Sequence, residues 1–104
     1  MIILGAGVSG ICMAKKLDEL GVRLDHTKQN SIDKGRKNYF ECSYTILEKS
    51  ESLGGTWWDN TYPGAACDIS SHLYSFSFFP NPYWSRAYSH QKEILEYLQD
   101  TASR

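Results

Sequence analysis

Cysteine is scarce in this 104-residue chain, and its few positions exclude two classes of site. Cys12, Cys42 and Cys67 are odd in number and form no C-x-x-C pair, so the sequence indicates neither a disulfide framework nor a zinc site. The three histidines stand far apart and lack the spacing of metal ligands. We therefore expect no bound metal.

An excess of charge is also missing, as is any long apolar run. The formal net charge is -1 and 22% of the residues are charged, which gives no electrostatic basis for a nucleic-acid partner or an acidic membrane surface. No apolar run is long enough to span a bilayer, and a glycine-rich turn begins at Gly5, where a signal peptide would need its apolar stretch. These absences favour a cytoplasmic protein without a membrane segment.

The glycine-rich turn near the start carries the first positive signal. Residues 1–4 are a short apolar run, residues 5–10 read G-x-G-x-x-G, and apolar residues at helical spacing follow. In such a unit Gly5 makes the tight turn, Gly7 lets a pyrophosphate approach the backbone, and Gly10 allows close packing of helix and strand. Because the motif follows a strand and opens a helix, it predicts a dinucleotide site.

The acidic residue that should bind the ribose arrives late. Such units place a carboxylate about 20 residues after the glycines, at the end of the second strand. Only one strand-like run ends in an acid, at Glu48, so we assign ribose binding to Glu48. Asp25 and Asp33 are rival acids, although neither ends such a run. Residues 22–42 then form an atypical insertion.

This insertion is polar, mildly basic and without sustained apolar periodicity. Loops longer than about 12–15 residues are uncommon inside a compact unit. The segment is either a surface loop with a basic tip at residues 34–37 or translated intron sequence, and the intact helix and strand around it favour the second. We expect residues 22–42 to be dispensable for folding, because they offer no apolar face to bury.

A stretch of glycines and aromatic residues, GGTWWDNTYPGAACD at 54–68, is unlike a polar loop. Gly54 and Gly55 let the backbone approach a ligand closely. The tryptophans supply flat apolar surface, and a Pro-Gly pair fixes a bend. The stretch therefore indicates contact with a large planar ligand, and the competing interpretation is an apolar turn packed on the core.

The same residues fit the pattern G-G-x-W-x-x-x-x-Y-P-G-x-x-x-D, which resembles a fingerprint of the Baeyer–Villiger monooxygenases, a group of flavin-containing monooxygenases that use FAD and NADPH. The runs at 71–78 and 83–89 are also similar to that family. The resemblance implies that the first glycine turn binds FAD. The cofactor-binding residues that it implies are Gly5, Gly7, Ser9, Gly10, Glu48, Lys49, Gly54, Gly55, Thr56, Trp57, Asp68 and Tyr74.

Asp68 is the residue that the resemblance places nearest to the reaction at the flavin. It implies that this aspartate lies beside the flavin and orients an arginine that stabilises the peroxyflavin, so Asp68 is the candidate catalytic residue. A cationic partner would keep the carboxylate ionised. The alternative interpretation is an Asx-type turn at the end of the loop.

The remaining segments complete the expected fold. Residues 73–79 fit a short strand or an extended aromatic loop, which a Pro-Asn-Pro run ends. Ser89 is expected to cap a helix that continues to Ala102. The expected fold class is α/β: a partial Rossmann-like FAD-binding βαβ unit with an aromatic-rich loop and a C-terminal helix, in which residues 1–104 form one incomplete domain.

The sequence contains one glycine fingerprint, and we identify neither a second one for NADPH nor the partner arginine. We therefore interpret the chain as the N-terminal FAD-binding part of a Baeyer–Villiger-type monooxygenase, which inserts oxygen next to the carbonyl of a small ketone. Its NADPH site would lie outside this chain, which alone would be inactive. The alternatives are a non-catalytic FAD-binding remnant and an N- or S-oxygenating flavin monooxygenase, which the Y-P-G-x-x-x-D string disfavours.

Overall fold

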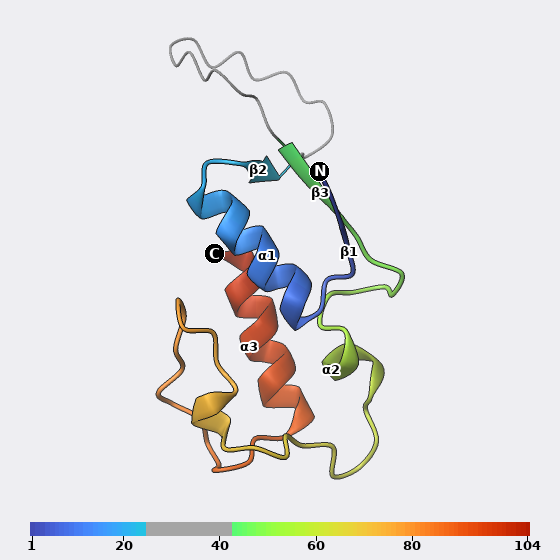
Figure 1. Ribbon diagram of the computed structural model, residues 1–104. Coiled ribbons are helices and arrows are strands. Elements are labelled where there is room, and N and C mark those ends of the chain that lie inside the picture. Colours follow the sequence, from blue (N-terminus) through green and yellow to red (C-terminus); the bar gives the residue numbers. More distant parts are fainter. Residues whose placement is uncertain (25–42) are drawn as a thin grey trace.

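The computed structural model describes residues 1–24 and 43–104. The strands gather at one end, α1 and α3 run through the middle, and the long loops close the other end (Figure 1). In chain order the elements are β1 (Ile2–Leu4), α1 (Val8–Glu19), β2 (Arg23–Leu24), β3 (Ser43–Leu47), α2 (Thr56–Asp59), the 3₁₀-helix η1 (Ser71–Leu73) and α3 (Gln91–Ser103).

The three described strands form one parallel sheet in the order β1-β3-β2. On one side of β3, Ile46 lies opposite Ile3 of β1; on its other side, Tyr44 lies opposite Leu24 of β2. Parallel strands need a crossover connection, and α1 follows β1 and packs on the sheet through Ala14. The predicted α/β class with a βαβ unit is confirmed.

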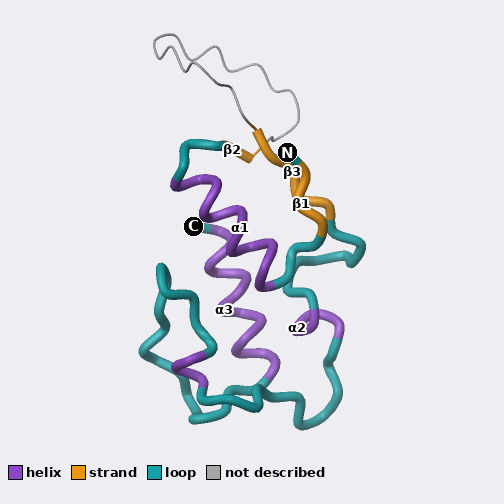
Figure 2. The backbone as a smooth tube through the Cα atoms, viewed as in Figure 1, coloured by secondary structure: helices purple, strands orange, loops and turns teal. Residues whose placement is uncertain are grey.

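Helix α3 extends from beside α1 toward the end of the molecule away from the sheet (Figure 2). It carries a second hydrophobic core, separate from the one that Ala14, Leu17 and Tyr44 form. Its side chains at helical spacing are buried, and Ile94 and Leu98 are only 0% and 1% exposed. The side chains that pack around these two residues are Ile11 of α1, Trp57 of α2, Cys67, Trp84 and Tyr97. One helix thus joins the glycine-rich end of α1 to the aromatic segments.

The start of α3 differs from the prediction. The helix begins at Gln91 with His90 in the N-cap position, and no side chain caps it. The prediction that Ser89 caps this helix is therefore wrong. Ser89 is fully buried, and its backbone N–H donates to Ser71 Oγ at 2.8 Å, so this serine is used in the interior rather than at the helix end.

Leu73 ends η1 and residues 74–79 form a loop, so of the two interpretations of residues 73–79 the extended aromatic loop is confirmed from residue 74 on. Phe76 and Phe79 make an isolated antiparallel bridge, in which the Phe79 N–H donates to the Phe76 carbonyl at 3.1 Å. Their rings each stack on Tyr97 with centroids 5.9 Å apart. Ring packing on α3, rather than pairing in a sheet, fixes this segment.

The first residues of the predicted insertion belong to the fold. The Val22 N–H donates to the Leu17 carbonyl at 2.9 Å, Val22 packs in the core under the sheet, and the following two residues form β2. A boundary at residue 22 is therefore too early. The rest of the segment, including the rival acids Asp25 and Asp33, lies outside the described residues.

Candidate functional site

The first glycine turn has the geometry that its sequence predicts. Gly5 has a φ of 91°, a conformation that favours glycine, and its N–H donates to the Leu47 carbonyl at 2.7 Å. A Cβ on Gly10 would collide with the carbonyl oxygen of Gly5. The turn therefore sits directly between the ends of β1 and β3 and the start of α1.

The second glycine pair lies against the first turn. Gly54 and Gly55 have φ values of 128° and 54°, and the Gly54 N–H donates to the Ala6 carbonyl at 2.9 Å. A Cβ on Gly55 would lie 3.0 Å from the Gly7 Cα, which is tighter than nine in ten real Cβ contacts. Two glycine turns, far apart in sequence, thus form one backbone surface without side chains.

Glu48 lies beside this surface, at the end of β3. Its Oε2 accepts the Ala6 N–H at 2.6 Å and its Oε1 accepts the Ser50 N–H at 2.8 Å. The hydrogen bond from Ala6, followed by the one from Ser50, lowers the pKa of Glu48 below its ordinary value. The contribution of this carboxylate to stability is therefore present at neutral pH and is lost as the pH falls through the lowered pKa.

A pocket of about 480 Å³ opens where these parts meet. It is lined by Leu4, Gly5, Gly7, Leu47, Glu48, Lys49, Gly55 and Asp59. Five of these are predicted cofactor-binding residues, so the structure brings together the two glycine turns and the acid. Sequence reasoning missed Asp59, whose Oδ1 accepts the Ser50 hydroxyl at 3.1 Å. Only the short helix α2 brings Asp59 to this rim, and no motif residue marked it.

The other predicted residues lie away from this pocket. Ser9 and Gly10 are in α1, Gly54 packs on Leu95, and Thr56 and Trp57 open α2. None of them lines the 480 Å³ pocket, although the Gly54 N–H donates to the Ala6 carbonyl and the Trp57 N–H to the Gly54 carbonyl.

Trp57 is a core residue that holds Tyr74. Its ring is 9% exposed, and its Nε1–H donates to the Tyr74 hydroxyl at 2.7 Å, with the two rings edge to face at 5.5 Å. Gln91 of α3 donates through Nε2 to the Trp57 carbonyl at 2.5 Å. Trp57 thus packs on the core, as the competing interpretation expects, and its part in cofactor binding stays a prediction. Tyr74 lines a second hollow of about 290 Å³ that begins at Val8 on α1.

Asp68 lies on an exposed segment after a tight turn. The Ala65 N–H donates to the Tyr62 carbonyl at 3.1 Å, and Gly64 has a φ of 83°, as a Pro-Gly turn of type II requires. The side chain of Asp68 is exposed. In the described part of the chain, the salt bridges are Lys16–Glu19, Lys92–Glu96 and Arg104–Asp100, so none supplies the arginine expected beside Asp68.

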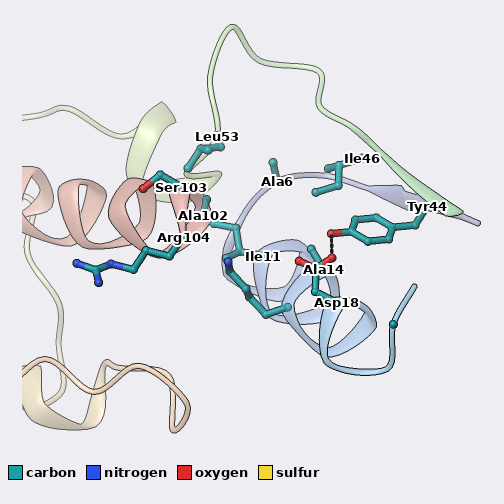
Figure 3. Close-up of a pocket in the computed structure, with 12 residues that line it drawn as sticks. Ala6, Ile11, Ala14, Asp18, Tyr44, Ile46, Leu53, Ala102, Ser103 and Arg104 are labelled. Atoms are coloured by element: carbon teal, nitrogen blue, oxygen red, sulfur yellow. Dashed lines mark hydrogen bonds between the residues drawn. The ribbon is translucent and has the colours of Figure 1, made fainter. Parts of the chain in front are cut away.

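A larger pocket, of about 580 Å³, lies between α1, β3 and the end of α3 (Figure 3). None of the predicted cofactor-binding residues lines it. Among its polar groups is the Tyr44 hydroxyl, which donates to Asp18 Oδ1 at 3.0 Å. Burial, followed by this hydrogen bond, raises the pKa of Tyr44 to about 12. Size alone therefore does not identify the dinucleotide site.

The described residues give no metal cluster: in 1–24 and 43–104, no three His, Cys, Asp or Glu side chains gather closely enough to hold an ion. Within the same ranges, no helix is both long and apolar enough to cross a membrane. The compartment stays a prediction.

Comparison with known proteins agrees with this geometry. Residues 3–90 match the family model described as an NAD(P)-binding Rossmann-like domain. The FAD-binding monooxygenase BOA2 of Botryotinia fuckeliana is 44% identical over 101 residues, which are 97% of this chain and 16% of that protein. A Baeyer-Villiger monooxygenase of Streptomyces coelicolor is 40% identical over 100 residues, 96% of this chain and 16% of that protein.

Solved structures give the same result. The closed crystal structure of cyclohexanone monooxygenase is 35% identical to this chain, with a TM-score of 0.73. The match covers 99% of this chain and 17% of the cyclohexanone monooxygenase chain. An oxidised steroid monooxygenase bound to NADP is 30% identical, also with a TM-score of 0.73 and the same coverage. The chain thus spans about one sixth of the length of these relatives. It belongs to the NAD(P)-binding Rossmann-like domain family, and the relatives that match nearly its whole length are FAD-binding and Baeyer–Villiger monooxygenases.

Proposed function

We propose that this chain is the N-terminal FAD-binding part of an FAD- and NADPH-dependent monooxygenase of Baeyer–Villiger type. One observation carries the proposal: the backbones of Gly7 and Gly55 meet without side chains at the pocket that Glu48 lines. A Cβ at Gly55 would press on the Gly7 backbone at this surface. The relatives support FAD as the dinucleotide, because their names specify FAD binding.

The residues around this pocket suit the pyrophosphate and the ribose of an adenosine diphosphate group. The first turn of α1 holds no acidic residue, and a helix N-terminus favours an anion such as a pyrophosphate. Glu48, whose lowered pKa further favours the ionised form, accepts hydrogen bonds and so suits ribose hydroxyls. Lys49 adds a positive charge at the rim. When bound, the flavin would supply the redox chemistry, and the protein the orientation.

Asp68 is the proposed catalytic residue of the whole enzyme. Its exposed carboxylate is available to hold and orient an arginine from another part of that enzyme, since charge-assisted hydrogen bonds between arginine and carboxylate are strong and directional. A small ketone is the proposed substrate class. One related cyclohexanone monooxygenase structure holds ε-caprolactone, the lactone that forms when oxygen is inserted next to the carbonyl of cyclohexanone, so it fits a ketone as substrate.

Glu48→Gln tests the FAD site. The neutral amide keeps the size of the side chain but is a weaker acceptor, so we expect FAD affinity to fall by at least about tenfold. Fluorescence titration of the flavin with purified chain measures the dissociation constant. Glu51→Gln, an exposed glutamate three residues away, is the matched control and should leave the affinity unchanged. Equal affinity in all three proteins would remove Glu48 from the site.

The chain by itself is expected to bind FAD without turning over a ketone. This expectation follows from the single G-x-G-x-x-G motif in the sequence, because hydride transfer needs a bound nicotinamide as well. The measurement is loss of nicotinamide absorbance in a mixture of chain, FAD, NADPH and cyclohexanone, with a cyclohexanone monooxygenase as positive control. Ketone-dependent NADPH consumption by the 104-residue chain would contradict this division of the enzyme.

A further inference from the structure

Two serine hydroxyls meet in the interior, next to the segment that carries Asp68. Ser71 and Ser89 are both 0% exposed. A buried hydroxyl costs free energy unless it is hydrogen-bonded, so such a pair persists where its bonds hold the structure together. The site described above uses neither side chain.

The Ser71 hydroxyl joins three groups of one neighbouring segment. It donates to the Arg86 carbonyl at 2.8 Å and accepts the Ser89 N–H at 2.8 Å. The two serine oxygens lie 2.9 Å apart, and the geometry of the pair leaves the Ser89 hydroxyl to donate to Ser71. One side chain therefore fixes residues 86–89 against the start of η1.

These contacts fasten the backbone on both sides of Asp68. Before it, the Cys67 N–H donates to the Ser89 carbonyl at 3.0 Å; after it, the Ser71 N–H donates to the Ala87 carbonyl at 2.8 Å. Asp68 is thus held between two attachment points that share the 86–89 segment, although its own side chain is exposed and unsupported by burial. Its direction depends on those attachments.

We propose that Ser71 is a positioning residue for Asp68: its buried hydroxyl, through Arg86 and Ser89, holds the segment that presents the Asp68 carboxylate. Asp68's use beside a flavin rests on the proposed function above, whereas the immobilisation of Asp68 by Ser71 does not. The two claims can therefore be tested separately.

Backbone ¹⁵N relaxation of the FAD-free chain tests the immobilisation. In the unmodified protein the order parameter of the Asp68 amide should be that of rigid backbone, about 0.85, and in Ser71→Ala it should fall below about 0.6. The amide of Gly55, in the glycine surface, should keep its value in both proteins. Ser103→Ala, an exposed serine at the end of α3, is the matched control and should change neither amide.

Ser89→Ala provides a graded second variant in case Ser71→Ala does not fold. It removes one of the three contacts that the Ser71 hydroxyl makes with residues 86–89 and keeps the Ser89 N–H, so the Asp68 order parameter should fall by less. The proposal is overturned if Ser71→Ala folds and the Asp68 amide keeps its high order parameter. If Ser71→Ala does not fold, the same result in Ser89→Ala overturns it. An equal fall in the order parameters of the Gly55 and Asp68 amides also overturns the proposal, because it indicates that the whole chain has become more mobile.

FAD addition then tests the dependent step. FAD should shift the Asp68 amide resonance in the unmodified chain, and by a smaller amount in the mobile variant. If FAD binds nowhere, the proposed function fails while the relaxation result stands. If FAD binds and shifts Asp68 equally in a variant whose Asp68 is mobile, Ser71 does not position Asp68 for the flavin.

Discussion

Gly10→Ala is expected to destabilise the chain by about 3 kcal/mol or more, because no small movement accommodates the new methyl group. A Cβ at this position meets the carbonyl oxygen of Gly5, which is backbone and cannot rotate away, with the Ile3 side chain 3.6 Å behind it. Relief requires α1 to move off the end of β1. Since the glycine turn lies between these elements, FAD binding should be lost along with stability.

Urea unfolding followed by circular dichroism measures the loss. Gly21→Ala is the matched control: Gly21 has a φ of 79°, but a Cβ there has no atom within 4 Å. This control bears only the strain of the left-handed conformation, about 1–2 kcal/mol. The prediction fails if the two variants unfold at the same urea concentration. The clash with Gly5 would then cost no more free energy than the replacement of a glycine elsewhere in the chain.

The glycine turn illustrates what local sequence can predict. Gly5 and Gly10 occupy positions whose roles are set by the turn itself, so strand, turn and helix follow from residues within one short stretch. The acid Glu48 was found the same way, because it ends a strand-like run. Contact between Gly7 and Gly55 could only be inferred from the family resemblance, since nothing local brings residues so distant in sequence together.

Roles that depend on distant partners were misjudged or missed. Ser89 lies just before a helix, so its sequence position predicts a cap. In the structure it is instead hydrogen-bonded in the interior to Ser71, which lies 18 residues earlier. The sequence around Trp57 fits a ligand platform and a core residue equally well, and its packing against residues of α3 could not be predicted from that sequence. Short-range patterns carry no information about such competitors.

The early boundary at residue 22 has a similar cause. A two-residue strand is too short to show periodicity, so Arg23–Leu24 could not be recognised from sequence. Pairing with the start of β3 makes it a strand. Deletion designs that test whether the insertion is dispensable should therefore keep Val22 and β2.

Tyr97→Phe is expected to cost about 3 kcal/mol, although the ring stays in place. The Tyr97 hydroxyl accepts the Phe76 N–H at 2.8 Å and donates to the Phe79 carbonyl at 2.7 Å, closing the aromatic loop from inside. Removing one oxygen leaves two partly buried backbone groups without a partner, and each such group costs about 1–3 kcal/mol. Equilibrium urea unfolding of both proteins gives the difference.

The hydroxyl, not the aromatic surface, is the group under test, so the control must also lose only an oxygen. Tyr83→Phe does so on a ring that is 87% exposed, and a change within about 0.5 kcal/mol is expected. Tyr97 stands one helical turn from Ile94, so a loss of this size would show that the core of α3 depends on a polar bridge as well as on burial. Equal stability of Tyr97→Phe and Tyr83→Phe would mean that ring stacking alone holds residues 76–79 on α3.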